Sequence, residues 1–233
     1  MSKPQRYVTV RFHEIAVVYR NQDPYRALID EIFTEAKIET YLHDGRLLSQ
    51  HPYGRRLIAL LDLAASSETF ERAKVMEFLT ETHLLRATRE RYEDREKRIF
   101  VRPSEWEAYT RDAGVVEGAA QWQTRLRRLA DEKREAAREE GREWLDGVAD
   151  RIETLMRFAA DLHAALAARP REATWDEHLS FARGLAGQYA EDTGEILKAL
   201  EDLRLISSVR EPVTFEEFCR AVRDDLERRD TSN

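Results

Sequence analysis

Cysteine, glycine and proline are scarce in this chain, and each shortage excludes a class of protein. The single cysteine, Cys219, has no partner for a disulfide and cannot belong to a multi-thiolate metal site. Nine glycines and six prolines among 233 residues are too few for an all-β fold with many tight turns. No apolar run approaches the roughly 20 residues that span a bilayer, and the N-terminus lacks the apolar core of a signal peptide. We therefore expect a soluble, cytoplasmic protein without a membrane partner.

The common catalytic motifs are missing as well. The chain has no G-x-x-x-x-G-K-[ST] phosphate loop, no G-x-G-x-x-G, no H-E-x-x-H and no G-x-S-x-G. Its six histidines are scattered, and each is interpreted as a surface or core residue. Cys219 follows Phe218 on an expected amphipathic helix, so a buried, inert thiol is the default interpretation. We expect no catalytic residue, metal or cofactor in this chain alone.

Charged residues make up 36% of the chain and apolar residues 42%, a balance that favours long helices with solvated faces. Acidic residues number 45 and basic residues 38, which gives a net charge of −7. Any contact with nucleic acid must therefore come from a local basic patch, because the whole chain is acidic.

The chain changes character near residue 45. The β-branched run 15–19 predicts a buried strand, Leu28 to Phe33 have helical spacing, and residues 38–42 predict a second strand. Strand, helix and strand with short links predict a βαβ unit, which is too small to form a stable sheet alone. Residues 1–45 are thus expected to form a short α/β stub, 46–227 a helical domain, and 228–233 a frayed tail.

Three helices of the second part are expected to begin with capping boxes, in which a Ser or Thr and a Glu three residues later satisfy each other's backbone donors. The pairs are Ser104 with Glu107, Thr174 with Glu177, and Thr214 with Glu217. A long charged stretch, 119–168, is expected to be helical with a break at Gly141 or Gly147, and a further helix is expected over 193–205. We find no internal repeat.

One basic segment stands out against the acidic background. Four acidic residues and the aromatics Tyr92 and Phe100 are interleaved with it, and Trp106 follows. Basic residues among aromatics can follow a phosphate backbone and stack on bases, whereas the plainer interpretation is a solvated, salt-bridged helix. The candidate DNA-binding residues are Arg86, Arg89, Arg91, Arg95, Lys97, Arg98 and Arg102.

Three smaller features complete the candidates. Gly114 and Gly118 bracket an apolar turn between two helices, which could offer backbone amides to a DNA phosphate or be an ordinary connection. Arg20 follows the first predicted strand and could contact a phosphate or pair with a nearby carboxylate. Glu35-Ala36-Lys37 matches the E-x-K of metal-dependent nucleases, but it lies at a helix end without the upstream Asp that such a site requires.

Read together, residues 14–79 resemble motif IV of the UvrD/Rep-type superfamily 1 DNA helicases and the entry to their inserted 2B subdomain. The resemblance rests on the Tyr19-Arg20 pair after a strand, the helix ending at Lys37-Ile38, and Asp44-Gly45 before the next helices. The segments 51–63 and 70–79, with Arg111 to Leu126, look closer to the AddB-like helicase-nuclease branch.

The resemblance implies a mostly α, multi-helix 2B-like accessory domain joined to a stub of the second RecA-like domain. It also implies that Arg20 approaches the γ-phosphate of ATP, with Mg, in a larger helicase or helicase-nuclease of DNA repair and recombination. The implied partners are duplex or junction DNA and the remaining helicase or nuclease domains. Two alternatives stay open: a protein-interaction module using the acidic surface of residues 131–201, and a metal-dependent nuclease around Glu35 and Lys37.

Overall fold

A computed structural model describes residues 15–18, 25, 28–29, 32–33, 36–38, 47–81, 84, 86–189, 200–201 and 212–228. These residues are mostly helical, as the composition predicts. Backbone contacts divide the chain into two compact units, Met1–His43 and Asp44–Asn233. The division lies close to the boundary after residue 45 that the sequence predicts, and each unit is described by itself below.

In the first unit, the described part of the predicted helix is helical. Residues 25, 28, 29, 32 and 33 have helical conformation, and the amide of Ala36 donates to the carbonyl of Ile32 at 2.9 Å. Lys37 has a φ of 53°, and the amide of Ile38 reaches back to the carbonyl of Phe33 at 2.8 Å. A left-handed residue followed by an amide that donates to a carbonyl five residues earlier is a common end of a helix. Glycine is the usual residue at the left-handed position.

The strand predicted for residues 15–19 is wrong over the residues that the structure describes there. Residues 15–18 are in no strand, and Ile15, Val17 and Val18 are exposed. An apolar β-branched run becomes a buried strand only when neighbouring strands pair with it, and no described residue does so. Tyr19, Arg20 and the predicted second strand after Ile38 lie outside the described residues.

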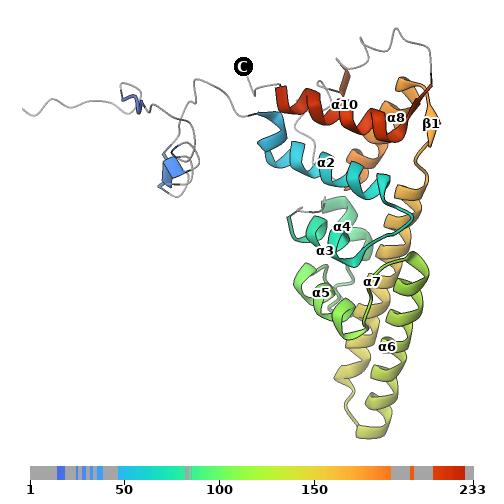
Figure 1. The fold of residues 1–233 in the computed structure, drawn as a ribbon. Helices are drawn as coiled ribbons and strands as arrows, with labels where there is room; N and C mark the ends of the chain where they lie inside the picture. The colour runs from blue at the N-terminus through green and yellow to red at the C-terminus, as the bar shows by residue number, and fades with distance from the viewer. Residues whose placement is uncertain are drawn as a thin grey trace, which may run out of the picture. The chain divides into compact units, whose positions relative to one another are not determined.

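The second unit is a set of packed helices (Figure 1). Its described elements are η2 (Leu48–Gln50), α2 (Pro52–Ala65), α3 (Arg72–Glu81), α4 (Arg86–Tyr92), α5 (Pro103–Asp112), α6 (Ala119–Glu140), α7 (Trp144–Ala167), β1 (Glu172–Ala173), α8 (Trp175–Tyr189), β2 (Val213–Thr214) and α10 (Phe215–Arg228). Residues 200 and 201 are helical and belong to the helix predicted over 193–205.

The longest helices, α6 and α7, lie side by side as a hairpin (Figure 1). The expected break falls at Gly141, which has a φ of 64° and ends α6, whereas Gly147 lies inside α7. Glycine adopts this left-handed conformation without the steric cost that a Cβ would impose. Gly141 thus allows the chain to leave α6 and enter the hairpin turn.

Phe158 of α7 is the centre of the core. Its ring lies 5.2 Å from that of Tyr92 on α4, 4.9 Å from Trp106 on α5 and 6.4 Å from Tyr189 on α8. All four side chains are buried, and aromatic pairs at these separations add to the free energy of burial. One ring of α7 thus joins three other helices.

Two similar units, each a short strand followed by a capped helix, close the fold. β1 pairs antiparallel with β2, and α8 and α10 begin directly after them. In both capping boxes the Thr amide donates to the Glu carboxylate at 2.9 Å, as predicted for Thr174 and Thr214. The sequence shows no internal repeat, because the two units share little besides Thr-aromatic-acid-Glu.

The third predicted capping box, at Ser104, is wrong. α5 begins at Pro103 and its N-cap is Arg102, because the amide of Trp106 already donates to the carbonyl of Arg102 at 3.1 Å. Proline is well suited to the first helical position, where its missing amide proton costs nothing. Ser104 therefore lies inside the first turn.

Candidate phosphate-contacting surface

The basic segment, residues 86–102, folds as a helix, a tight turn and a short extended stretch. α4 ends at Tyr92, and a β-bridge between Asp94 and Ile99 then closes a four-residue turn. Residues 100–102 continue without helical structure into α5. The candidate cations are thus distributed over three local structures rather than along one helix face.

The inner side of the basic segment is anchored to α7 and α8. Thr88 donates its hydroxyl hydrogen to the carbonyl of Gln188, and the Tyr92 hydroxyl donates to Oδ2 of Asp161 at 2.7 Å. Burial, supported by the hydrogen bond to Asp161, raises the pKa of Tyr92. Ile99 and Val101 also point into the core. These contacts hold the segment so that its basic side chains face outward.

Three of the four interleaved acidic residues have partners within the basic segment. Glu90 pairs with Arg86 at 2.7 Å, and a carboxylate oxygen of Glu93 accepts the amide of Val101 at 3.3 Å. Oδ1 of Asp94 accepts the amides of Glu96 and Lys97 at 3.0 and 3.1 Å, which stabilises the turn. Glu93 and Asp94 therefore accept hydrogen bonds from backbone amides and form no ion pair with the arginines that the structure describes.

All seven candidate cations are exposed, but they fall into two groups. Arg86 and Arg102 form ion pairs with Glu90 and Glu105, and Lys97 lies 3.8 Å from a carboxylate oxygen of Asp150. Arg89, Arg91, Arg95 and Arg98 form no ion pair with any residue that the structure describes. These four guanidinium groups, here called the unpaired arginines, are the strongest candidates for an anionic ligand.

Glu90 reports the positive potential at this surface. Its pKa is lowered, first by the hydrogen bond from Arg86 and further by the charges of Arg95 and Arg89. The charges of α4 and of the turn therefore act on one carboxylate. The charges of Arg95 and Arg89 are the smaller contributions to this shift, after the ion pair with Arg86.

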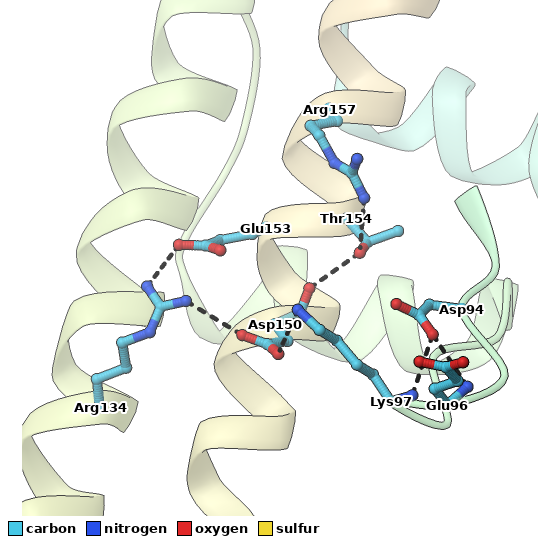
Figure 2. A network of polar contacts seen from close by, with 8 residues as sticks. All are labelled: Asp94, Glu96, Lys97, Arg134, Asp150, Glu153, Thr154 and Arg157. Carbon is cyan, nitrogen blue, oxygen red and sulfur yellow. Dashed lines mark hydrogen bonds and ion pairs between the residues drawn. The ribbon is translucent and has the colours of Figure 1, made fainter. Parts of the chain in front are cut away.

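Lys97 connects the turn to the α6–α7 hairpin (Figure 2). Asp150 of α7 faces Lys97 with one oxygen and accepts a hydrogen bond from Arg134 of α6 with the other, at 3.2 Å. Arg134 also pairs with Glu153, and this hydrogen bond lowers the pKa of that carboxyl. Lys97 is thus tied into a polar network, unlike the unpaired arginines.

Gly114 and Gly118 have positive φ values of 70° and 82°, but their amides are engaged inside the chain. The amides of Gly114 and Val115 donate to Arg111 and Thr110, which ends α5 in a Schellman motif, and the amide of Gly118 donates to Thr69 at 2.6 Å. The side-chain oxygen of Gln121 accepts hydrogen bonds from the amides of Val116 and Glu117. This geometry supports an ordinary helix connection and leaves no amide of residues 114–118 for a phosphate.

The remaining candidates contribute little to a site. Arg20 and Glu35 lie outside the described residues, so neither the γ-phosphate contact nor the nuclease alternative has a geometry. Burial raises the pKa of Cys219 to about 12, which keeps its thiol protonated. Within the described ranges, no three His, Cys, Asp or Glu side chains gather as a metal site would require, and no helix is long and apolar enough to cross a membrane.

Sequence reasoning identified the basic residues but not which of them are paired. Glu90 and Glu105 stand four and three residues after their arginines, a helical spacing that could have indicated these two pairs. The partner of Lys97, Asp150, is distant in the sequence and carries no such signal.

Comparison with protein families, with curated proteins and with solved structures finds no match to this chain. The fold and the surface together describe a helical module whose basic segment is anchored to the core and exposes its cations.

Proposed function

We propose that this chain is a non-catalytic accessory module that contacts the phosphate backbone of nucleic acid through its basic segment. The observation that carries the proposal is the group of four unpaired arginines, Arg89, Arg91, Arg95 and Arg98, on a segment whose inner side is anchored to the core. Guanidinium groups are well suited to phosphate, because their planar set of donors matches its oxygens.

The wider setting is part of the same proposal. The resemblance of residues 14–79 to UvrD/Rep-type helicases, and of later segments to the AddB-like branch, supports an accessory 2B-like domain beside an ATP-dependent motor. The mostly helical structure of the described residues after 47 is compatible with that role. ATP, Mg, the Arg20 contact, the RecA-like stub and the partner domains belong to that setting.

The electrostatics make the proposal testable with a matched control. A basic surface that binds phosphates releases condensed counterions, so the association constant falls with salt by a logarithmic slope of about 0.9 per duplex phosphate contact. The chain carries a net charge of −7, so general attraction to DNA is weak and the slope reports the local surface.

The experiment measures anisotropy of a fluorescent duplex with a single-stranded tail at several salt concentrations. Replacing Arg91, Arg95 and Arg98 together with Gln is expected to weaken binding and to reduce the salt slope by about 3. The control replaces Arg111, Arg128 and Arg138, which carry the same charge on α5 and α6, and is expected to leave binding nearly unchanged. Equal losses in both variants, or no binding by the wild type at low salt, would refute the proposal.

A protein-binding module is the second candidate, and Trp144 favours it. This residue begins α7 at the hairpin turn and is 64% exposed, which is unusual for a tryptophan. The exposed residues Glu139, Glu140 and Glu143 precede it in the sequence, so a partner would need a basic rim and an apolar pocket. A chain that binds no DNA at low salt, together with salt-insensitive protein binding lost in Trp144→Ala, would select this candidate.

A further inference from the structure

The aromatic residues in the basic segment and directly after it differ sharply in exposure. Tyr92 and Trp106 are only 4% and 1% exposed, and both rings pack on Phe158. Phe100 is 36% exposed, although it is a large apolar side chain in the middle of a charged surface. Of these three aromatics, only Phe100 can contact a ligand.

Local backbone structure directs the Phe100 ring outward. The bridge between Asp94 and Ile99 and the hydrogen bond from the Val101 amide to Glu93 fix the backbone on both sides. Ile99 and Val101 are buried while Phe100 and Arg102 are exposed, which is the alternation of an extended segment over a core. Moving the ring inward would require moving two core residues outward.

Arg102 keeps the ring in place. Its guanidinium carbon lies 5.6 Å from the centroid of the Phe100 ring, within the range of a cation–π contact, and its Nη1 pairs with Glu105 at 2.8 Å. The ring therefore contacts a guanidinium group that is itself fixed to the first turn of α5 through Glu105. An exposed aromatic two residues after Arg98, on the same segment as the unpaired arginines, is a combination typical of surfaces that bind single-stranded nucleic acid.

Bases differ from phosphates in where they are accessible. In a duplex the base faces are stacked on one another, whereas an unpaired strand can offer a face to a protein ring. We propose that Phe100 is a base-stacking residue and that the basic segment takes single-stranded nucleic acid in preference to duplex. This inference rests on the proposed function, because the unpaired arginines must bind the phosphates of the same strand.

The test compares three fluorescent probes of equal length: oligo-dT, a blunt duplex, and an oligomer with abasic sites in place of thymidines. The wild type is expected to bind oligo-dT most tightly. Phe100→Ala is expected to weaken oligo-dT binding by about 5- to 150-fold, the range for loss of one stacked base, and to leave binding of the other two probes unchanged. Val116→Ala, an exposed apolar truncation outside the segment, is expected to change none of them.

Two more variants separate stacking from folding. Phe100→Leu keeps apolar bulk and is expected to lose oligo-dT affinity as the Ala variant does, while Phe100→Trp is expected to retain it. The indole introduced at position 100 should also be quenched by oligo-dT and not by the abasic probe. Circular dichroism of each variant checks that the helical fold is retained.

The outcomes distinguish this inference from the function on which it rests. If Phe100→Ala weakens oligo-dT and the abasic probe equally, or if the wild type binds duplex as tightly as oligo-dT, the stacking role is refuted. Loss of binding in the triple Gln variant would still support phosphate contact in that case. If the triple Gln variant binds every probe like the wild type, the proposed function itself fails.

Discussion

The hydroxyl of Tyr92 donates a hydrogen bond of 2.7 Å to Oδ2 of Asp161, a residue 69 positions further along the chain. Tyr92 is buried and ends α4, while Asp161 belongs to α7. This bond attaches the end of α4, inside the basic segment, to α7. It also places two tyrosines, Tyr92 and Tyr189, beside one carboxylate whose charge disfavours a tyrosinate.

Stability at high pH should depend on these tyrosines. Burial, with the charge of Asp161, raises the pKa of Tyr189 from 10.0 to about 12, and the pKa of Tyr92 is raised as well. An unfolded chain loses these protons from about pH 10, whereas the folded chain keeps them. The stabilisation is therefore complete below pH 10 and is lost as the pH rises towards 12.

Urea unfolding at pH 8, 10 and 11 measures this effect. We expect Tyr189→Phe to flatten the fall in unfolding free energy between pH 10 and 11 relative to the wild type. Tyr25→Phe is the matched control, since Tyr25 is exposed, and it should follow the wild type at every pH. Parallel curves for wild type and Tyr189→Phe would show that Tyr189 titrates normally in the folded chain.

The two capping boxes predict an unequal result for three similar substitutions. Thr174→Ala and Thr214→Ala each remove a cap that the structure contains, at an expected cost of about 1 kcal/mol. Ser104→Ala should cost much less, because Ser104 lies inside the first turn of α5 and caps nothing. Thermal or urea unfolding of the three variants gives the comparison, and an equal loss at Ser104 would contradict the assigned start of α5.

The wrongly predicted helix start at Ser104 illustrates what a local sequence pattern can and cannot specify. A Ser or Thr followed three residues later by Glu predicts a helix start, and it identified two starts correctly. At Ser104 the same pattern competed with Pro103, whose fixed φ suits the first helical position. The local rule was right about the presence of a helix and wrong about its first residue.

The candidate surface shows the same division. The sequence was sufficient to identify the candidate cations, because the charge of a side chain follows from its residue type alone. The pairing of Lys97 and the burial of Tyr92 depend on Asp150, Phe158 and Asp161 of α7, about 50 to 70 residues away. The strand prediction for residues 15–18 was wrong for a related reason. Burial of a strand depends on neighbouring strands, which the run itself does not specify.

Gly54 should tolerate no side chain. A Cβ at this position would lie 1.8 Å from the carbonyl oxygen of Leu48, a backbone atom of η2 that cannot turn aside. We expect Gly54→Ala to cost more than about 3 kcal/mol or to abolish folding, as severe steric overlap in a core does. Helicity and urea unfolding measure the effect.

Gly187 provides the matched control for that substitution. It is an exposed position inside α8, and a Cβ there would meet nothing within 4 Å. Gly187→Ala should stabilise the chain by about 1 kcal/mol, because alanine favours a helix over glycine. A neutral result for Gly54→Ala would mean that η2 does not rest on α2 as described.

Arg98 is expected to lower the unfolding free energy of the chain and to contribute to DNA binding. It is the last residue of the turn and has a φ of 54°, a left-handed conformation that costs a residue with a Cβ roughly 1 kcal/mol. Arg98→Gly is therefore expected to raise the unfolding free energy by up to about 1 kcal/mol and to reduce the salt slope of DNA binding by about 0.9. Arg98→Gln keeps the backbone cost and removes only the charge, so it should lower the slope without stabilising the fold. Urea unfolding and anisotropy on the same two proteins separate the effects; stabilisation by Gly with unchanged binding would remove Arg98 from the phosphate-contacting surface.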